Sequence, residues 1–301
     1  MNWEHLYAKA QQHDVRSIAR CISIIENDGE GYMDILKALP NNSKCSVIGI
    51  TGPPGAGKST LTDGLIAEFV SKGKKVAVLC VDPSSPFNLG ALLGDRIRMS
   101  VWYTNPSVYI RSLATRGSLG GLHPRIIEIT EFLKSMAFDL VIIETVGVGQ
   151  SEVEIAGLAD VTVVVLVPEA GDEIQTMKAG LMEIADIFVV NKSDRPQAEQ
   201  FLRHLEILAH SSEKNIPVIK TIASEKTGLH ELSESIDFKL NELTHSERKY
   251  WLLAERAYHL IRTARMRDIK KDDLKKNIRE AMNRSSFNLY SYIQPYIDKN
   301  E

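Results

Sequence analysis

The sequence contains little cysteine, and the cysteines it has are scattered. Cys21, Cys45 and Cys80 are the three cysteines in a chain of 301 residues. They are too few and too far apart for a disulfide framework, and no Cys-x-x-Cys pair indicates a metal site. Cys45 and Cys80 lie in apolar runs typical of strands, so we expect buried free thiols.

The sequence also lacks blocks of one charge and long apolar runs. Its formal net charge is −3 and it has no basic block, so we expect no nucleic-acid partner. The longest apolar run, residues 161–167, is far too short to cross a bilayer, so we expect no membrane partner. The N-terminus carries Glu4 and His5 without an apolar core, unlike a signal peptide. We therefore expect a cytoplasmic protein, or one of an organelle matrix if a targeting segment has been removed.

Short apolar runs rich in β-branched residues alternate with longer helical patterns through the middle of the chain. Their continuous apolar character is typical of strands buried on both faces of a parallel sheet. The runs span residues 45–50, 76–81, 108–110, 140–143, 161–167, 187–190 and 218–221. This alternation predicts an α/β fold with a mostly parallel sheet, whose ligand site lies beyond the carboxyl ends of the strands.

Two flanks lack strand patterns. Residues 1–42 show helical apolar spacing at Ile18, Cys21, Ile22 and Ile25, and residues 246–265 and 271–282 have helical patterns. A helical tail of this size cannot bury its apolar side chains alone, so it must pack on the core or on another subunit. We predict a helical N-terminal extension (1–42), an α/β domain (43–240) and a helical C-terminal arm (241–301).

The string GPPGAGKS at residues 52–59 is a complete phosphate-binding P-loop. An apolar run precedes it and helical spacing at Leu61, Leu65 and Phe69 follows, which is the strand–loop–helix setting the motif requires. Backbone N–H groups and the positive helix end would bind phosphate. Lys58 would reach the β- and γ-phosphates, and the Ser59 hydroxyl would bind Mg2+. The predicted nucleotide contacts here are Gly52, Pro54, Gly55, Ala56, Gly57, Lys58, Ser59 and Thr60.

The tetrapeptide Asn191-Lys192-Ser193-Asp194 follows a predicted strand at the same edge of the sheet. The Asp194 carboxylate can accept hydrogen bonds from N1–H and the 2-amino group of guanine, whereas adenine offers neither donor. Sites built on such hydrogen bonds discriminate by about 10⁴ or more. We predict that Asn191, Lys192 and Asp194 recognise the guanine of GTP or GDP, with the backbone amide of Ala223 near guanine O6.

Acidic residues lie near the same edge. Glu144 ends a predicted strand where many GTPases carry Asp-x-x-Gly, and the amide of Gly147 would sense the γ-phosphate. Asp82 directly follows another strand, and Asp95 lies on a loop that could fold over a metal. Mg2+ prefers a few carboxylate or hydroxyl oxygens together with water and phosphate. We predict a Mg2+ site formed by Ser59, Asp82, Asp95 and Glu144.

Phosphoryl transfer requires mainly positioning and charge stabilisation. Lys58, Glu144 and Gln150 form the predicted catalytic set. Val148 stands where some GTPases place a catalytic glutamine, so we expect slow turnover until a partner orders the loops. The candidates for the group that completes the site are Gln150, Arg96 and Arg116, and either arginine could instead be a solvated surface residue.

Five further strings outside the P-loop are uncommon in sequence. They are VDPSSPF (81–87), LGDRIRM (93–99), LGG (119–121), ETVGVGQSE (144–152) and GDEIQ (171–175). With them, the chain resembles the methylmalonyl-CoA mutase-associated GTPase family (MeaB/ArgK type), which belongs to the P-loop GTPases. The resemblance covers roughly residues 40–235 strongly and the helical flanks only loosely. It departs from the family at Glu169, where a small residue is usual, and at Asn88-Leu89-Gly90, where Thr-Gly-Gly is common.

The resemblance implies a GTP-hydrolysing chaperone that protects an adenosylcobalamin-dependent acyl-CoA mutase of the methylmalonyl-CoA mutase type. Such a chaperone gates cofactor loading from an adenosyltransferase and the removal of damaged cofactor. The resemblance also implies a homodimer in which the C-terminal helices form an arm. It makes the segment 170–180 a switch towards the mutase, with Asp172, Gln175 and Lys178 as polar residues, although the segment could simply be a polar loop into a helix.

Three other functions are weighed against this one. A P-loop kinase linked to arginine/ornithine transport would need an acceptor site and a lid. A nickel-insertion GTPase would need Cys and His ligands near the nucleotide, and the eight histidines and three cysteines form no tight cluster in the sequence. A nucleotide-stabilised scaffold would bind GTP without useful turnover.

Overall fold

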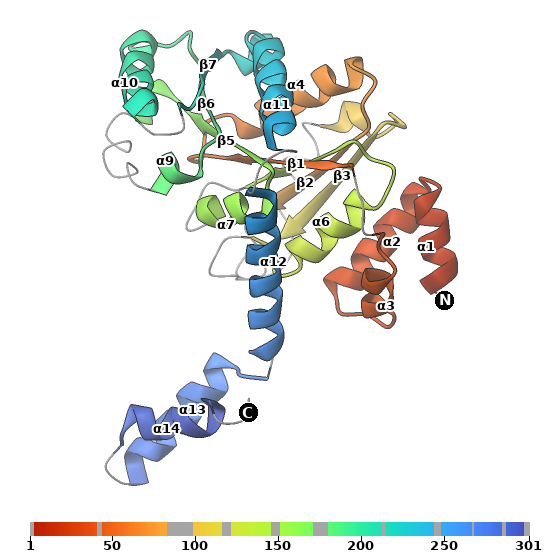
Figure 1. Cartoon of the computed structure of the whole chain (residues 1–301), viewed down its shortest axis with the longest axis vertical. Coiled ribbons are helices and arrows are strands. Elements are labelled where there is room, and N and C mark those ends of the chain that lie inside the picture. The colour runs from red at the N-terminus through yellow and green to blue at the C-terminus, as the bar shows by residue number, and fades with distance from the viewer. Residues whose placement is uncertain are drawn as a thin grey trace. The chain divides into compact units, whose positions relative to one another are not determined.

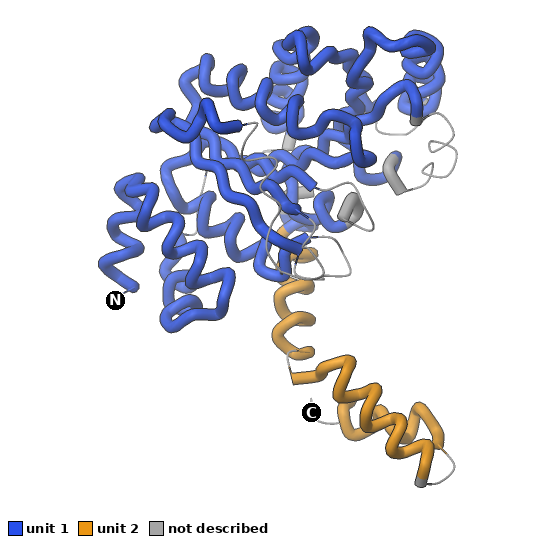
Figure 2. Tube along the Cα trace, turned by 180° about the vertical axis from the view of Figure 1, so that it is seen from behind, with its two compact units in different colours: residues 1–252 blue, residues 253–301 orange. Residues whose placement is uncertain are grey.

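The computed structural model describes residues 3–40, 44–82, 99–115, 122–145, 151–170, 180–211, 215–243, 248–266, 268–284 and 287–297. The chain divides into two compact units, Met1–Leu252 and Leu253–Glu301 (Figure 2). The sequence boundaries at residues 42 and 240 are not tested by this division and stay predictions.

The first unit contains a seven-stranded sheet with the order β3-β2-β4-β1-β5-β6-β7 (Figure 1). Every pair of neighbouring strands is parallel. The strands are β1 (Ser46–Thr51), β2 (Val76–Asp82), β3 (Val108–Ala114), β4 (Leu140–Glu144), β5 (Val161–Leu166), β6 (Ile187–Asn191) and β7 (Val218–Thr221). Each predicted run forms a strand, and the predicted α/β fold class is confirmed.

Helices cover both faces of this sheet. In Figure 1, α4 and α11 lie over one face and α6 and α7 over the other. Among the described residues, the helices of the sheet domain are α4 (Lys58–Ser71), α6 (Ile126–Lys134), α7 (Ser151–Leu158), α9 (Gly180–Ile184), α10 (Ala198–Ser211) and α11 (Leu229–Leu243). Three short 3-10 turns accompany them, η1 (Ser100–Trp102), η2 (Pro168–Ala170) and η3 (Ala223–Glu225).

The two faces of β1 belong to different hydrophobic clusters, because successive side chains of a strand point to opposite sides. Val47 is buried in a cluster with α6 and α7, whereas Ile48 and Ile50 are buried in a cluster with α4 and α11. Burial on both faces explains why the strand sequences are continuously apolar rather than alternating.

Three N-terminal helices pack on the sheet domain. They are α1 (Trp3–Gln11), α2 (Val15–Glu26) and α3 (Tyr32–Lys37). The predicted apolar stripe of α2 is fully buried in the same cluster as Phe132 and Leu133 of α6. Glu26 at the end of α2 receives a 2.8 Å hydrogen bond from Arg111 of β3, which adds a polar tie to this packing.

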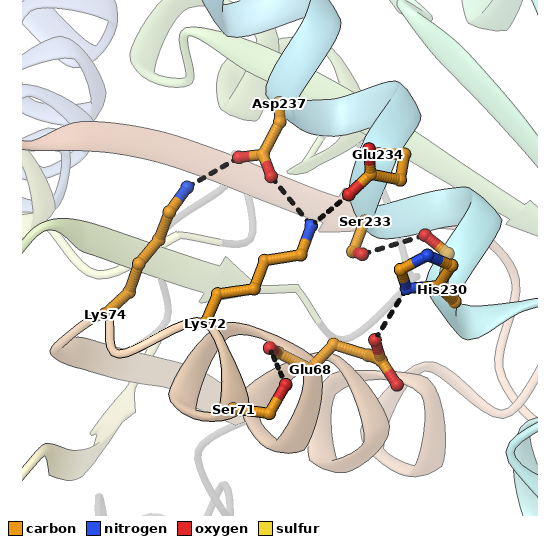
Figure 3. A network of polar contacts seen from close by, with 8 residues as sticks. All are labelled: Glu68, Ser71, Lys72, Lys74, His230, Ser233, Glu234 and Asp237. Atoms are coloured by element: carbon orange, nitrogen blue, oxygen red, sulfur yellow. Dashed lines mark hydrogen bonds and ion pairs between the residues drawn. The ribbon is translucent and has the colours of Figure 1, made fainter.

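A polar cluster joins the end of α4 to α11 (Figure 3). Lys72 contacts Glu234 at 2.7 Å and Asp237 at 2.9 Å, and Lys74 contacts Asp237 at 2.6 Å. Partial burial opposes ionisation of Asp237, but hydrogen bonds from Lys74 and Lys72 outweigh it, so the net effect lowers the pKa of Asp237 below its usual 3.8. These contacts hold the far end of the helix that begins at the P-loop.

The second unit is helical, with most of α12 (Arg248–Arg265), α13 (Lys271–Arg284) and α14 (Leu289–Ile297). The first and second of these agree with the sequence expectation, but α14 was not predicted, because Pro295 interrupts its helical pattern. No apolar side chain among the described residues of 253–301 is buried.

All three cysteines are buried free thiols, as the sequence predicts. Burial raises the pKa of Cys21 to about 11 and that of Cys45 to about 12. In the part of the chain that the structure describes, no helix combines the length and the apolar character needed to cross a membrane.

The Asp237 cluster predicts a pH-dependent stability. Since the folded pKa lies below 3.8, the carboxylate stabilises the fold above that pH and loses this effect as pH falls through the folded value. We expect Asp237→Asn to lower stability by about 0.5–1 kcal/mol at neutral pH, or roughly 1–4 °C in Tm, and the difference to shrink as pH falls below 3.8. Glu234→Gln, whose carboxylate is 61% exposed, is the control with a smaller effect. Thermal melts from pH 3 to 7 test this, and a pH-independent difference would contradict it.

Candidate functional site

The loop between β1 and α4 requires glycine at both ends. Gly52 has φ 137°, and a Cβ at this position would lie 2.0 Å from the Val165 carbonyl oxygen of β5. Gly57 has φ 89°, and its Cβ would lie 2.4 Å from Nδ2 of Asn191. A side chain at either position would therefore meet both backbone strain and a steric clash. The close approach brings the loop against β5 and β6.

Lys58 is the first residue of α4, and its side chain is buried. Its ammonium group donates to the carbonyl oxygens of Gly52 at 2.8 Å and Pro53 at 2.9 Å. A buried ammonium group needs such acceptors, because leaving a charge without them in the interior is strongly unfavourable. The loop thus bends around the head of Lys58, at the place where the sequence predicts phosphates.

Ser59 connects the loop to the end of β4. Its hydroxyl donates to Oε1 of Glu144 at 2.6 Å, and the Glu144 side chain is buried. Asp82 ends the neighbouring strand β2 and is also buried. In the register of these strands Cys80 lies opposite Glu144, so Asp82 lies beyond it at the same edge.

A hydroxyl and two carboxylates at one sheet edge fit Mg2+, which prefers oxygen ligands. The structure brings together Ser59 and Glu144 in direct contact, and strand pairing places Asp82 on the adjacent strand. Within the described residues, no group of three or more His, Cys, Asp or Glu side chains forms a ready metal site.

Asn191 ties the predicted base-recognition motif to the P-loop. Its Nδ2 donates to the Ala56 carbonyl at 2.8 Å, and its Oδ1 accepts from the Thr221 hydroxyl at 3.0 Å and the Ala223 amide at 3.1 Å. Lys192 adjoins it with φ 55° and donates from Nζ to the Gly55 carbonyl at 2.7 Å. Three segments of the chain, the P-loop, the end of β6 and the end of β7, therefore meet at the buried Asn191 amide and its neighbour Lys192.

Asp194 lies in the exposed turn that follows. The amide of Ser193 donates to the Thr221 carbonyl at 3.1 Å, and the amide of Arg195 donates to the Lys192 carbonyl at 3.0 Å. These backbone bonds fix the turn in which the exposed Asp194 lies. The Ala223 amide, predicted to contact guanine O6, donates to Oδ1 of Asn191 at 3.1 Å in this structure.

The sequence did not predict a contact between Glu169 of η2 and Arg195. Their side chains form an ion pair on the surface. The hydrogen bond from Arg195 lowers the pKa of Glu169 below its usual value. Glu169 and Arg195 belong to loops after β5 and β6, which are neighbouring strands of the sheet, and local sequence patterns do not indicate this adjacency.

Six of the predicted site residues lie outside the residues that the structure describes. They are Asp95, Gly147, Gln150, Asp172, Gln175 and Lys178. Arg96 and Arg116 also lie outside. The described residues that the structure brings to one edge of the sheet are Gly52, Pro54, Gly55, Ala56, Gly57, Lys58, Ser59, Thr60, Asp82, Glu144, Asn191, Lys192, Asp194 and Ala223.

Comparison with solved structures shows the fold. A crystal structure described as an LAO/AO transport system kinase matches with a TM-score of 0.72, over 99% of this chain and 98% of that chain. Its sequence identity is 23%, so the similarity concerns the fold alone.

Two relatives are closer in sequence. A protein of Pyrococcus abyssi that is named as a GTPase is 46% identical over 241 residues, which are 77% of this chain and 74% of that protein. A fused isobutyryl-CoA mutase of Geobacillus kaustophilus is 39% identical over 232 residues, which are 70% of this chain and 21% of the fused protein.

A family model described as methylmalonyl-CoA mutase-associated GTPase MeaB matches residues 18–283. This match covers the described P-loop, the Glu144 strand end and the Asn-Lys-Ser-Asp motif. The resemblance expected from the sequence is thereby confirmed. The chain belongs to the methylmalonyl-CoA mutase-associated GTPase family, and it is a GTP-binding P-loop GTPase.

Proposed function

We propose that the chain hydrolyses Mg2+-bound GTP at the β1–α4 loop and uses this cycle to gate adenosylcobalamin loading of an acyl-CoA mutase. The observation that carries the nucleotide site is the pair of bonds from Asn191 and Lys192 to the Ala56 and Gly55 carbonyls. They fix the motif suited to guanine at a set distance from the loop suited to phosphate. One guanine nucleotide can span both only if this distance is held.

Lys58 and Ser59 act at the phosphate end of the site. The ammonium group of Lys58 exchanges the carbonyls of Gly52 and Pro53 for the β- and γ-phosphates and stabilises the charge that develops in phosphoryl transfer. The Ser59 hydroxyl would hold Mg2+, with Glu144 beside it and Asp82 and Asp95 as further acids. The metal, when bound, neutralises phosphate charge. The amide of Gly147 and the side chain of Gln150 complete the proposed site.

Asp194 sets the preference for guanine. Its carboxylate is exposed beside a turn fixed by three backbone or side-chain contacts, so it can receive the two donors of the base edge. Adenine leaves both carboxylate oxygens without a donor, and this loss is the basis of discrimination.

Asp194→Asn should exchange the base preference. We expect GTP affinity to fall by about 10²-fold or more and xanthosine triphosphate to bind better, since the new amide donates to the 2-oxo group of xanthine. Titration calorimetry with GTP, ATP and xanthosine triphosphate measures this. Glu225→Gln, an exposed carboxylate in η3, is the control and should keep the GTP preference. Equal binding of ATP and GTP by the wild type would refute the assignment.

The proposed client is an adenosylcobalamin-dependent acyl-CoA mutase, with an adenosyltransferase as the cofactor donor. Two findings support it: the name of the family model and the relative in which a similar sequence is fused to an isobutyryl-CoA mutase. Fusion of two activities in one chain indicates that they act together in that protein. In this chain, we propose that Asp172, Gln175 and Lys178 form the switch that signals to the mutase whether GTP or GDP is bound.

The client proposal predicts nucleotide-dependent binding. With purified methylmalonyl-CoA mutase or isobutyryl-CoA mutase, we expect association to differ between GTP, GDP and a non-hydrolysable analogue, and phosphate release to rise by roughly 10-fold or more. Lys178→Ala should reduce this stimulation while GTP affinity stays near the wild-type value. Lys44→Ala, at an exposed position before β1, is the control. No effect of either mutase on turnover would exclude both as clients.

We also propose that the chain forms a homodimer through its C-terminal helices. One side of α12 carries three exposed apolar side chains, spaced seven and three residues apart. They are Trp251 (58% exposed), Tyr258 (64%) and Ile261 (55%). Since no apolar side chain among the described residues of 253–301 is buried, this unit needs a surface to pack against. A second copy offers the same apolar stripe.

Tyr258→Glu combined with Ile261→Glu should therefore convert the dimer to a monomer. Charges in an apolar interface lose hydration without gaining partners. Light scattering over a concentration series measures the mass. Thr263→Glu, on another side of α12 and also exposed, should leave the dimer intact. A wild-type mass of one chain at all concentrations would contradict the proposal.

A further inference from the structure

Two buried threonine hydroxyls join the ends of β1 and β4. Oγ1 of Thr145 donates to Oγ1 of Thr51 at 2.9 Å, and the residues are 1% and 0% exposed. The backbone amide of Thr145 also donates to the Ile50 carbonyl at 3.0 Å. Ile50 and Glu144 are register partners, so the two threonines extend the ladder by one step.

This pair adjoins both functional contacts of the P-loop. Thr51 directly precedes Gly52, whose carbonyl accepts a hydrogen bond from Lys58. Thr145 directly follows Glu144, which accepts a hydrogen bond from Ser59. Lys58, proposed for the γ-phosphate, is thus hydrogen-bonded to the residue after Thr51, and Ser59, proposed for Mg2+, to the residue before Thr145.

A pair of hydroxyls is a restrictive choice for a buried position. Valine has nearly the same shape as threonine but buries an apolar methyl group in place of the hydroxyl. A buried hydroxyl is unfavourable unless it is hydrogen-bonded, so valine would be the simpler choice for packing alone. The hydroxyl pair, however, is directional, and β-branching limits χ1 of each threonine. Two stiff side chains with one directional bond fix the offset between strands more closely than apolar contact does.

We propose that Thr51 and Thr145 are positioning residues for GTP hydrolysis, and this rests on the proposed nucleotide site. The hydroxyl pair holds the end of β4 at a fixed offset from the start of the P-loop. This offset sets where Glu144 stands relative to Ser59 and where the chain leaves towards the predicted γ-phosphate contacts. Nucleotide affinity depends mainly on the loop and the guanine motif, so the pair acts on turnover rather than on binding.

Valine substitutions separate positioning from packing. We expect Thr145→Val to lower kcat by roughly 10-fold, with KM for GTP and GDP affinity changed by less than about 2-fold. Thr145→Ser, which keeps the hydroxyl, should retain most of kcat. The double variant Thr51→Val/Thr145→Val removes both hydroxyls, so neither is left buried without a hydrogen-bond partner. We therefore expect Tm near the wild type but kcat as low as in Thr145→Val.

Thr130→Val is the matched control. Thr130 is a fully buried threonine of α6 whose hydroxyl donates to the Ile126 carbonyl at 2.6 Å, away from the P-loop. Its loss should lower Tm and leave kcat unchanged. Single-turnover and steady-state phosphate release with Mg2+ and GTP, together with thermal melting, give all the quantities needed.

The outcomes are distinct. Wild-type kcat in a folded double variant would overturn the positioning role, as would a loss of GDP affinity equal to the loss of kcat. If Thr145→Val alone does not fold, the double and serine variants decide the question. Absence of GTP hydrolysis by the wild type, in contrast, would overturn the proposed function itself, whatever the variants do.

Discussion

The central constraint on this structure is that the backbone carbonyls of the P-loop need hydrogen-bond donors, and side chains supply them. Residues 52–57 connect β1 to α4 without regular structure, and their carbonyls cannot all be paired within a helix or a sheet. The carbonyls of Gly52 and Pro53 are paired by Lys58, that of Gly55 by Lys192 and that of Ala56 by Asn191. Lys58, Asn191 and Lys192, which are the side chains proposed to contact the nucleotide, therefore also fix the conformation of the loop.

Helix α4, which begins at the P-loop, is itself fixed by side-chain contacts along its length. Ser59 at its start contacts Glu144 of β4, and Asp63, one turn later on the same side, accepts a 2.7 Å hydrogen bond from the indole of Trp102 in η1. Lys72 at the far end is held by α11. The helix is thus attached at three places along its length, and Trp102 anchors the chain where it enters β3.

Much of the fold follows from local sequence patterns, since the alternation of buried strands and amphipathic helices is local. The strand order does not, because β1 lies between β4 and β5 and only long-range packing decides this. The P-loop and Asn-Lys-Ser-Asp could be predicted because their chemistry fixes residue types at fixed spacing. Thr51 and Thr145 could not, since two threonines 94 residues apart carry no pattern until the strands pair. Helix α14 could not either, because Pro295 has no backbone N–H to donate and disfavours a helix interior in any local pattern.

The interior position of every thiol has a practical consequence for observing this protein at work. A thiolate is the reactive form of cysteine, and burial keeps Cys21 and Cys45 protonated at neutral pH, while Cys80 is also shielded from solvent. The native chain is therefore nearly silent towards maleimide dyes. One cysteine introduced on the surface would accept a single fluorophore without removal of any native cysteine, so labelled samples could follow the protein during GTP hydrolysis.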